Sequence, residues 1–385
     1  MRRFKCFSLL LVVAFLFSLH ILNSNPIIVK AVDIDFSTSA KSMCVMEKDS
    51  GRIIAGKNFD TKLAMASTTK VVTALTVVQN CNNLDEQIQV SDSSVGVEGS
   101  SIYLRKDEII SIKDLLYGLM LRSGNDSAVA LACHVGGSVE GFAKLMNETA
   151  KKAGAKNSNF VTPHGLDHKD HYTTAYDLAK ITAYALNNPI FKEIVSTKMH
   201  IVEATNKSDK RYMSNKNKLL NTLEGCVGVK TGFTTKAGRC LVSAIERDNT
   251  TYVCVVLNCG PMFEESATLL NNADYFFKNV KIIDKNKEIY NEYIIDENHG
   301  KLYLYAEEDF YYPLAKGEIK DVKIEYNVQL DDAEENECVG EIKVFFKKDL
   351  LKTIKLYTMN KIDKLIDSNT LEINEILWEE KANED

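Results

Sequence analysis

The sequence predicts an α+β protein, in which an antiparallel sheet with a helical cluster is followed by a small all-β domain. Apolar segments of helix length fill residues 67–186, and β-rich segments lie on either side of them, at 40–54 and 226–257. Between residues 280 and 360 the helical patterns end and alternating, β-rich segments follow. A chain of 385 residues is also too long for one small core and suits two domains.

Residues 1–31 have the composition of a signal peptide. Three basic residues precede an apolar run from Phe7 to Leu22, and Val29 and Ala31 are small residues spaced as in a signal-peptidase site. Because the apolar run is somewhat long, an uncleaved membrane anchor is the alternative. Under either interpretation we expect the rest of the chain to be exported.

The charge balance argues against a nucleic-acid partner. The whole chain carries a formal net charge of −6, and its first 31 residues contain four basic residues and no acidic ones. The mature chain is therefore expected at about −10, whereas a nucleic-acid-binding surface is basic. Eight cysteines remain after Cys6 is removed with the signal peptide, and no C-x-x-C metal pair occurs. Most of the eight lie in apolar runs, so we expect mostly free thiols.

Residues 36–277 are predicted to form the first domain. It begins with a hairpin around the Lys48–Gly51 turn, followed by an apolar helix from Ser67 to Gln79. Further helices, marked by Ser or Thr caps and by glycine ends, are expected at 112–121, 126–134, 138–154 and 174–186. The last part should contain a strand at 226–231, a hairpin of 241–246 with 252–257, and a helix at 265–277.

The second domain is predicted at residues 280–360, where the β-rich segments suggest a sandwich-like arrangement of strands. Residues 361–385 form an acidic tail in which Asn369 and Glu372 could cap a short helix.

Three short motifs occur in order along the first domain. Ser67 and Lys70 form an S-x-x-K pattern, and residues three apart share one face of a helix. Ser123-Gly124-Asn125 lies in the break between two apolar helices, and Lys230-Thr231-Gly232 lies on a predicted strand. Each motif is weak alone. Their order and their predicted contexts together indicate a serine acyl-transferase site.

The chemistry assigns a role to each catalytic candidate. Ser67 is expected to be the acylated nucleophile, and Lys70 takes its proton once burial lowers the lysine pKa. Ser123 can relay a proton to the leaving amine, with the charge of Lys230 polarising that relay. Asn125 can donate from its amide to a substrate amide carbonyl.

The strand motif is expected to bind the substrate. Thr231 offers a hydroxyl to the substrate carboxylate, and Gly232 lets the chain approach closely because it lacks a Cβ. The N–H groups of Ser67 and Phe233 are the candidates for an oxyanion hole. The edge of this strand can pair with an extended peptide.

We expect no metal and no cofactor. Three histidines, at positions 164, 168 and 171, share one loop, but no Cys or Glu stands at ligand spacing beside them. His164 and His171 are better interpreted as hydrogen-bonded supports of that loop.

These motifs, together with Pro163-His164-Gly165-Leu166 and the run from His171 to Leu178, resemble those of low-molecular-weight penicillin-binding proteins of the D-alanyl-D-alanine carboxypeptidase family. The resemblance covers residues 40–277 well and the β domain more loosely. It implies a penicillin-binding/β-lactamase-like transpeptidase fold. It also implies that the protein acts at the cell wall or the outer face of the cytoplasmic membrane. The implied reaction releases the terminal D-alanine from peptidoglycan stem pentapeptides through a serine acyl-enzyme, with β-lactams as covalent inhibitors.

Two features depart from the family pattern. Members often carry an arginine just before the last helix of the catalytic domain, and residues 261–265 contain none. The substrate carboxylate would then depend on Thr231, Thr234 and Lys230, or on Arg239. Several members also end in an amphipathic membrane anchor, whereas this tail is acidic, so we favour a solvated tail over peripheral membrane contact.

Two other functions remain as alternatives. A class A β-lactamase needs a glutamate in an E-x-x-L-N pattern, and the nearest match, at residues 217–221, begins with asparagine. A non-catalytic exported protein could use the β domain to bind a cell-wall partner, but such a scaffold would have no need of Lys70 or Lys230.

Overall fold

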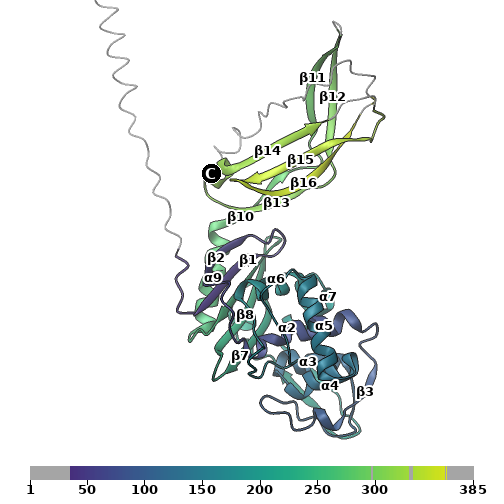
Figure 1. Cartoon of the computed structure of the whole chain (residues 1–385), viewed down its shortest axis with the longest axis vertical. Helices are drawn as coiled ribbons and strands as arrows, with labels where there is room; N and C mark the ends of the chain where they lie inside the picture. Colours follow the sequence, from purple (N-terminus) through teal and green to yellow (C-terminus); the bar gives the residue numbers. More distant parts are fainter. Residues whose placement is uncertain (1–34, 296–297, 329–332, 360, 362–385) are drawn as a thin grey trace, which may run out of the picture. The chain divides into compact units, whose positions relative to one another are not determined.

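A five-stranded antiparallel sheet is the centre of the first part of the chain (Figure 1). The computed structural model describes residues 35–295, 298–328, 333–359 and 361, so the expected signal peptide and nearly all of the acidic tail lie outside the described residues. The strand order is β2-β1-β9-β8-β7. The bounds are β1 (Ser42–Glu47), β2 (Ile53–Lys57), β7 (Cys226–Thr234), β8 (Gly238–Arg247) and β9 (Thr250–Leu257).

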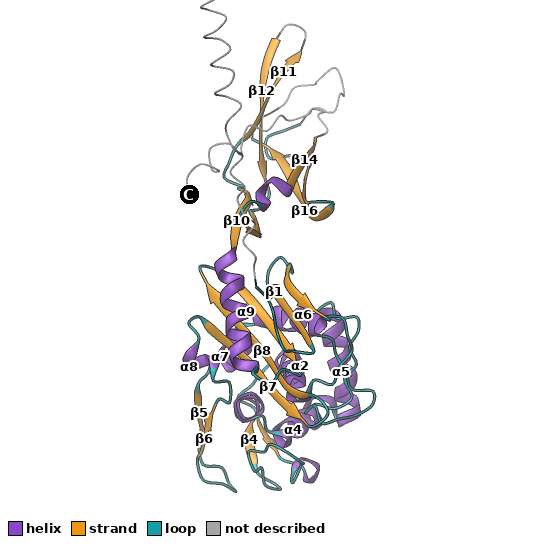
Figure 2. Cartoon of the chain, turned by 90° about the vertical axis from the view of Figure 1, so that its left-hand side faces the viewer, coloured by secondary structure: helices purple, strands orange, loops and turns teal. Residues whose placement is uncertain are grey.

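Helices pack on both faces of this sheet (Figure 2). Helix α9 (Met262–Phe276) contacts β8 and β9 on one face, and α6 (Ala175–Leu186) contacts β1 and β9 from the other. The helical cluster also contains α2 (Lys70–Asn80), α3 (Ile112–Tyr117), α4 (Asn125–Gly136), α5 (Val139–Lys152), α7 (Pro189–Ser196) and α8 (Leu219–Thr222). Helix α2 is buried from Lys70 to Val78, and its last two residues are exposed, as expected for an apolar helix enclosed by its neighbours.

Several smaller elements accompany the helical cluster. Two hairpins are made by β3 (Gln87–Gln89) with β4 (Ile109–Ser111), and by β5 (Met199–Val202) with β6 (Arg211–Ser214). Short helical turns are η1 (Ala66–Thr69), η2 (Asp92–Ser94) and the π-helical η3 (Gly118–Arg122).

The C-terminal all-β domain has a hydrophobic core of its own. Its five-stranded sheet has the order β11-β12-β16-β15-β14, and β10 pairs separately with β13. The bounds are β10 (Phe277–Ile283), β11 (Ile289–Ile295), β12 (Asn298–Ala306), β13 (Phe310–Ala315), β14 (Val322–Val328), β15 (Cys338–Phe346) and β16 (Asp349–Thr358), with a short turn η4 (Glu318–Asp321). The predicted α+β class, with an all-β domain after it, is therefore confirmed.

Most predicted helix ends are found at their caps. Ser111, Ser138 and Thr174 each accept a hydrogen bond from the backbone N–H three residues later, and Gly137 ends α4 with φ +70°. The sequence analysis did not identify α7. The preceding helix ends at Leu186 as expected, and Pro189 then begins α7, because Asn188 caps it and proline suits the first helical position.

All eight cysteines from Cys44 to Cys338 are free thiols in the part of the chain that the structure describes. Four of them, including Cys44 and Cys254, are buried, and burial raises the thiol pKa of Cys254 to about 12.

The buried carboxylate of Asp177 holds the loop that leads to the site. It accepts hydrogen bonds from the backbone N–H groups of Lys156 and Asn157, at 3.2 and 2.6 Å, and from the Ser158 hydroxyl at 2.7 Å. We predict that Asp177→Ala lowers the free energy of unfolding by about 2–4 kcal/mol, because it leaves these donors without their partner. Urea unfolding would measure this change. The exposed Asp170→Ala in the same loop should stay within about 0.5 kcal/mol of the wild type; equal effects would contradict the prediction.

Candidate active site

Ser67 lies in the turn η1, immediately before the buried helix α2. The preceding Ala66 has φ +50°, a conformation that costs energy for a residue with a side chain. The Thr69 hydroxyl donates to the Ala66 carbonyl at 2.8 Å. Gly165 packs beneath the same carbonyl, where a Cβ would lie 2.0 Å from its oxygen. The strained turn is therefore held by close contacts that only a glycine at position 165 permits.

A neutral histidine supports this turn from within the loop at 157–173. The Val161 N–H donates to Nδ1 of His171 at 3.1 Å, so the ring proton is on Nε2, which lies 2.8 Å from the Thr69 hydroxyl. Burial, and then the nearby His164 and His168, lower the pKa of His171 to about 3. The geometry agrees with a supporting role for this side chain.

Lys70 is completely buried, and its amine contacts three oxygens. Nζ lies 3.0 Å from Ser67 Oγ, 2.6 Å from Asn125 Oδ1 and 2.8 Å from the His164 carbonyl. Burial, together with the charges of Lys230 and Lys216, lowers the pKa of Lys70 well below its usual value, and Asp126 opposes the shift. A neutral amine can donate to the two carbonyl-type oxygens and turn its lone pair to the Ser67 hydroxyl. This arrangement suits proton removal from the serine.

The S-x-N motif occupies the turn between η3 and α4. Ser123 is buried, with φ +64°, and the Gly124 N–H donates to the Gly118 carbonyl at 3.0 Å. The Asn125 amide is already engaged at both ends, because Nδ2 donates to the Glu98 carbonyl at 2.6 Å while Oδ1 accepts from Lys70. One of its two amide hydrogens is thus used within the protein. Only the other is left to donate a hydrogen bond to a substrate.

Asp126, which the sequence analysis did not single out, anchors the loop at 98–104 to the N-terminus of α4. Its carboxylate accepts from the Ser101 hydroxyl at 2.6 Å and from the backbone N–H groups of Ile102 and Leu104. This loop supplies the carbonyls that hold Asn125, so Asp126 fixes the motif indirectly. In the sequence, the only indication of this role is the position of a carboxylate directly after the S-x-N motif.

Strand β7 brings the third motif to Ser67. Lys230 is buried and donates to the Thr231 carbonyl at 2.9 Å, and burial and the charge of Lys216 lower its pKa to about 7. A Cβ on Gly232 would lie 3.0 Å from the Ser67 and Thr68 nitrogens, so this strand runs directly against the backbone of the nucleophile. β7 ends the sheet order, so one of its edges is unpaired, and the side chain of Phe233 on this strand is exposed.

Two residues expected to bind the carboxylate are engaged elsewhere. The Thr234 hydroxyl donates to Asp167 Oδ1 at 2.9 Å and accepts from the Ala237 N–H. Arg239 stands opposite Phe233 on β8 and donates to the Gly260 carbonyl at 3.2 Å. The sequence analysis missed Lys216, which belongs to no motif and whose charge acts on both buried lysines.

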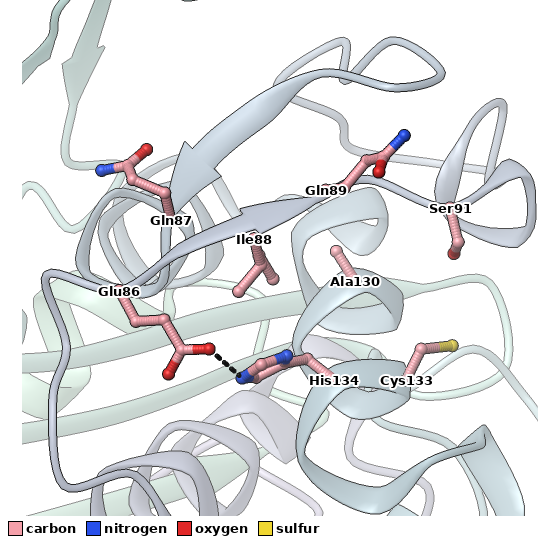
Figure 3. A pocket seen from close by; sticks show the side chains of 8 residues that line it. All are labelled: Glu86, Gln87, Ile88, Gln89, Ser91, Ala130, Cys133 and His134. Carbon is pink, nitrogen blue, oxygen red and sulfur yellow. Dashed lines mark ion pairs between the residues drawn. The ribbon is translucent and has the colours of Figure 1, made fainter.

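No group of three or more metal-ligating side chains was found in the described part of the chain. A separate hollow of about 400 Å³ lies between β3 and α4, lined by Glu86, Ile88, Cys133 and His134 among others (Figure 3). Its lining contains none of the motif residues, and the Glu86–His134 pair at 3.6 Å borders it. Among the described residues, none of the helices has the length and apolarity needed to cross a bilayer.

Comparison with known proteins gives two family matches that follow each other along the chain. A family model described as D-alanyl-D-alanine carboxypeptidase matches residues 28–260, and one described as the C-terminal domain of penicillin-binding protein 5 matches residues 277–364. The carboxypeptidase DacF of Bacillus subtilis is 32% identical over 63% of each chain. DacA of Haemophilus influenzae is 30% identical over 78% of this chain and 79% of its own.

Solved structures agree with these matches. Penicillin-binding protein 5 of Haemophilus influenzae has a TM-score of 0.69 at 29% identity, and the match covers 85% of this chain and 98% of that one. The Streptomyces K15 DD-transpeptidase has a TM-score of 0.59 at 30% identity, covering 61% of this chain and 97% of the other. The expected transpeptidase fold is therefore confirmed.

The close contact at Gly232 predicts that a methyl group there disturbs the nucleophile. We expect Gly232→Ala to slow acylation of Ser67 by a penicillin about tenfold or more, because the strand must move away from the Ser67 N–H. Gly260→Ala is the matched control, since a Cβ there meets nothing within 4 Å. Intact-protein mass spectrometry measures both rates. Equal rates in the two variants would contradict this account.

The lowered histidine pKa values predict a pH-dependent stability. Burial lowers the pKa of His164 to about 4 and that of His171 to about 3, from an ordinary 6.5. As pH falls below about 6.5 the unfolded chain binds these protons first, so stability decreases by up to about 1.4 kcal/mol per pH unit for each histidine. Urea unfolding between pH 6.5 and 5 should give a shallower pH dependence for His171→Asn than for the wild type. Equal slopes would show that His171 does not contribute.

Proposed function

The chain belongs to the D-alanyl-D-alanine carboxypeptidase family, and on this basis we propose that it removes the terminal D-alanine from peptidoglycan stem pentapeptides through an acyl-enzyme on Ser67. The observation that carries the assignment of the nucleophile is the buried Lys70 amine, 3.0 Å from the Ser67 hydroxyl and with a strongly lowered pKa. Loss of the terminal D-alanine removes the donor bond for cross-linking, so the reaction limits cross-linking of the wall.

In the acylation step, the substrate peptide lies along the free edge of β7. Ser67 Oγ attacks the carbonyl carbon of the penultimate residue while Lys70 takes the hydroxyl proton. The N–H groups of Ser67 and Phe233 bind the oxygen as it becomes negative. The close approach of β7 at Gly232 supports this role, because it brings the strand against the Ser67 backbone.

Collapse of the tetrahedral intermediate breaks the C–N bond, and the leaving amine takes the proton through Ser123. The buried Lys230 polarises that relay, and Thr231 offers its hydroxyl to the substrate carboxylate. Asn125 holds Lys70 in place through Oδ1 and keeps one amide hydrogen for a substrate carbonyl. Phe233 and Thr234 continue the strand edge on which the peptide extends.

Deacylation uses a water molecule, from which Lys70 again takes the proton as the ester to Ser67 is hydrolysed. A β-lactam follows the same first step, but its leaving nitrogen stays tethered in the product. The region between Asn125 and Lys230 has no E-x-x-L-N glutamate to activate water against this adduct. We therefore expect the penicilloyl-enzyme to be long-lived.

The family acts outside the cytoplasm on the cell wall. For this chain we propose export through residues 1–31 as a signal peptide and action at the wall or the outer face of the cytoplasmic membrane. We further propose that the acidic tail from residue 361 stays solvated, because an anionic bilayer repels it.

A test with two substrates separates this function from its alternatives. The mature protein is mixed with a fluorescent penicillin and with a peptide ending in D-Ala-D-Ala. We expect stable labelling together with release of D-alanine, and Ser67→Ala should abolish both. Rapid turnover of the penicillin would indicate a β-lactamase, and absence of labelling a non-catalytic protein. Labelling that persists in Ser67→Ala would mean that another residue is the nucleophile.

A further inference from the structure

The terminal carboxylate of the substrate needs a cation that the motifs do not supply. The segment before α9 contains no arginine, and the Thr234 hydroxyl donates to Asp167. Arg239 pairs with Phe233, so its side chain lies on the face of the sheet opposite to the one where Gly232 meets Ser67, and it donates to the Gly260 carbonyl. Lys230 is buried, and its amine donates to the Thr231 carbonyl. A further cationic side chain near Lys230 would complete the site.

Lys216 stands at the edge of the active site, in the segment between β6 and α8. Its backbone N–H donates to the Leu121 carbonyl at 3.1 Å, two residues before Ser123. Its Nζ donates to the Ser100 hydroxyl at 2.9 Å, and the Ser100 carbonyl accepts from the Asn125 N–H at 2.7 Å. Lys216 is therefore attached to both sides of the turn that carries the second motif. Unlike Lys70 and Lys230, it is exposed.

The charge of Lys216 acts on both buried lysines. Its charge adds to burial in lowering the pKa of Lys70 and that of Lys230, and partial burial followed by the charge of Arg122 lowers the pKa of Lys216 itself. The acid acting on Lys70 is Asp126, whose carboxylate is already engaged by the loop at 101–104. A cationic side chain at the edge of the site favours binding of an anion there.

The reaction geometry brings the substrate carboxylate to the same place. The leaving amine meets Ser123 in the proposed mechanism, and the carboxylate of the leaving D-alanine is only two bonds from that nitrogen. It must therefore lie beside the turn that Lys216 borders. An exposed ammonium can reach it without first losing its contact to Ser100 because lysine has three rotatable donors.

We propose that Lys216 binds the terminal carboxylate of the substrate. This inference rests on the proposed function and adds a substrate-binding residue to it. A charge-assisted hydrogen bond of this kind strengthens binding of the acylating substrate by about 10- to 100-fold.

Benzylpenicillin and its methyl ester provide the test, because they differ only in the charge of the carboxyl group two bonds from the reactive amide nitrogen. The second-order rate of Ser67 acylation is measured by intact-protein mass spectrometry for each compound. Lys216→Met should lower the rate with the free acid about 10- to 100-fold and change the rate with the ester less than about threefold. Lys216→Arg should retain most of the acid rate, because it retains the charge.

The controls separate charge recognition from structural damage. Lys151→Met, at an exposed lysine on α5, should behave as the wild type with both compounds. Lys216→Gln serves as a second neutral variant, and circular dichroism establishes that each variant is folded. An equal loss with acid and ester, or no loss with either, would overturn the inference. Absence of labelling in the wild type would instead overturn the proposed function.

Discussion

The burial of the Lys70 amine is the constraint on which the rest of the site depends. An ammonium without a carboxylate partner is costly in a dry interior, and here two further lysines act on it. Burial therefore favours the neutral amine more than in an exposed lysine, and that form needs only oxygens that accept. Asn125 and the His164 carbonyl supply them from two different elements. The fold is arranged to bring these oxygens, rather than a carboxylate, to Nζ.

Close backbone packing is the second requirement, and two glycines make it possible. Gly165 lies beneath the Ala66 carbonyl and Gly232 lies beside the Ser67 nitrogen. The turn η1, which carries Ser67, is thus enclosed between the loop at 157–173 and strand β7. Neutral His171 also contacts this turn, through its hydrogen bond to the Thr69 hydroxyl, and adds no charge to the site. The strain at Ala66 persists because the surrounding contacts over-determine the turn.

The sequence predicted what depends on local pattern. Periodicity and caps gave the helices after Ser111, Ser138 and Thr174, and alternation gave the two hairpins of the central sheet. The β5–β6 hairpin and α8 were not predicted, because their short segments carry little periodicity. The pairing of Thr234 with Asp167 and the place of Lys216 depend on segments far apart in the chain. No pattern within one segment can indicate such contacts.

The open edge of β7 has a consequence for self-association. An unpaired strand edge offers backbone donors and acceptors to any extended chain, including a second copy of this protein. Here the turn η1 packs against one face of β7 at Gly232, so a strand that pairs along this edge passes beside Ser67. A second copy bound there would occupy the place proposed for the peptide substrate. Self-association through this edge would therefore block the site as well as join two molecules.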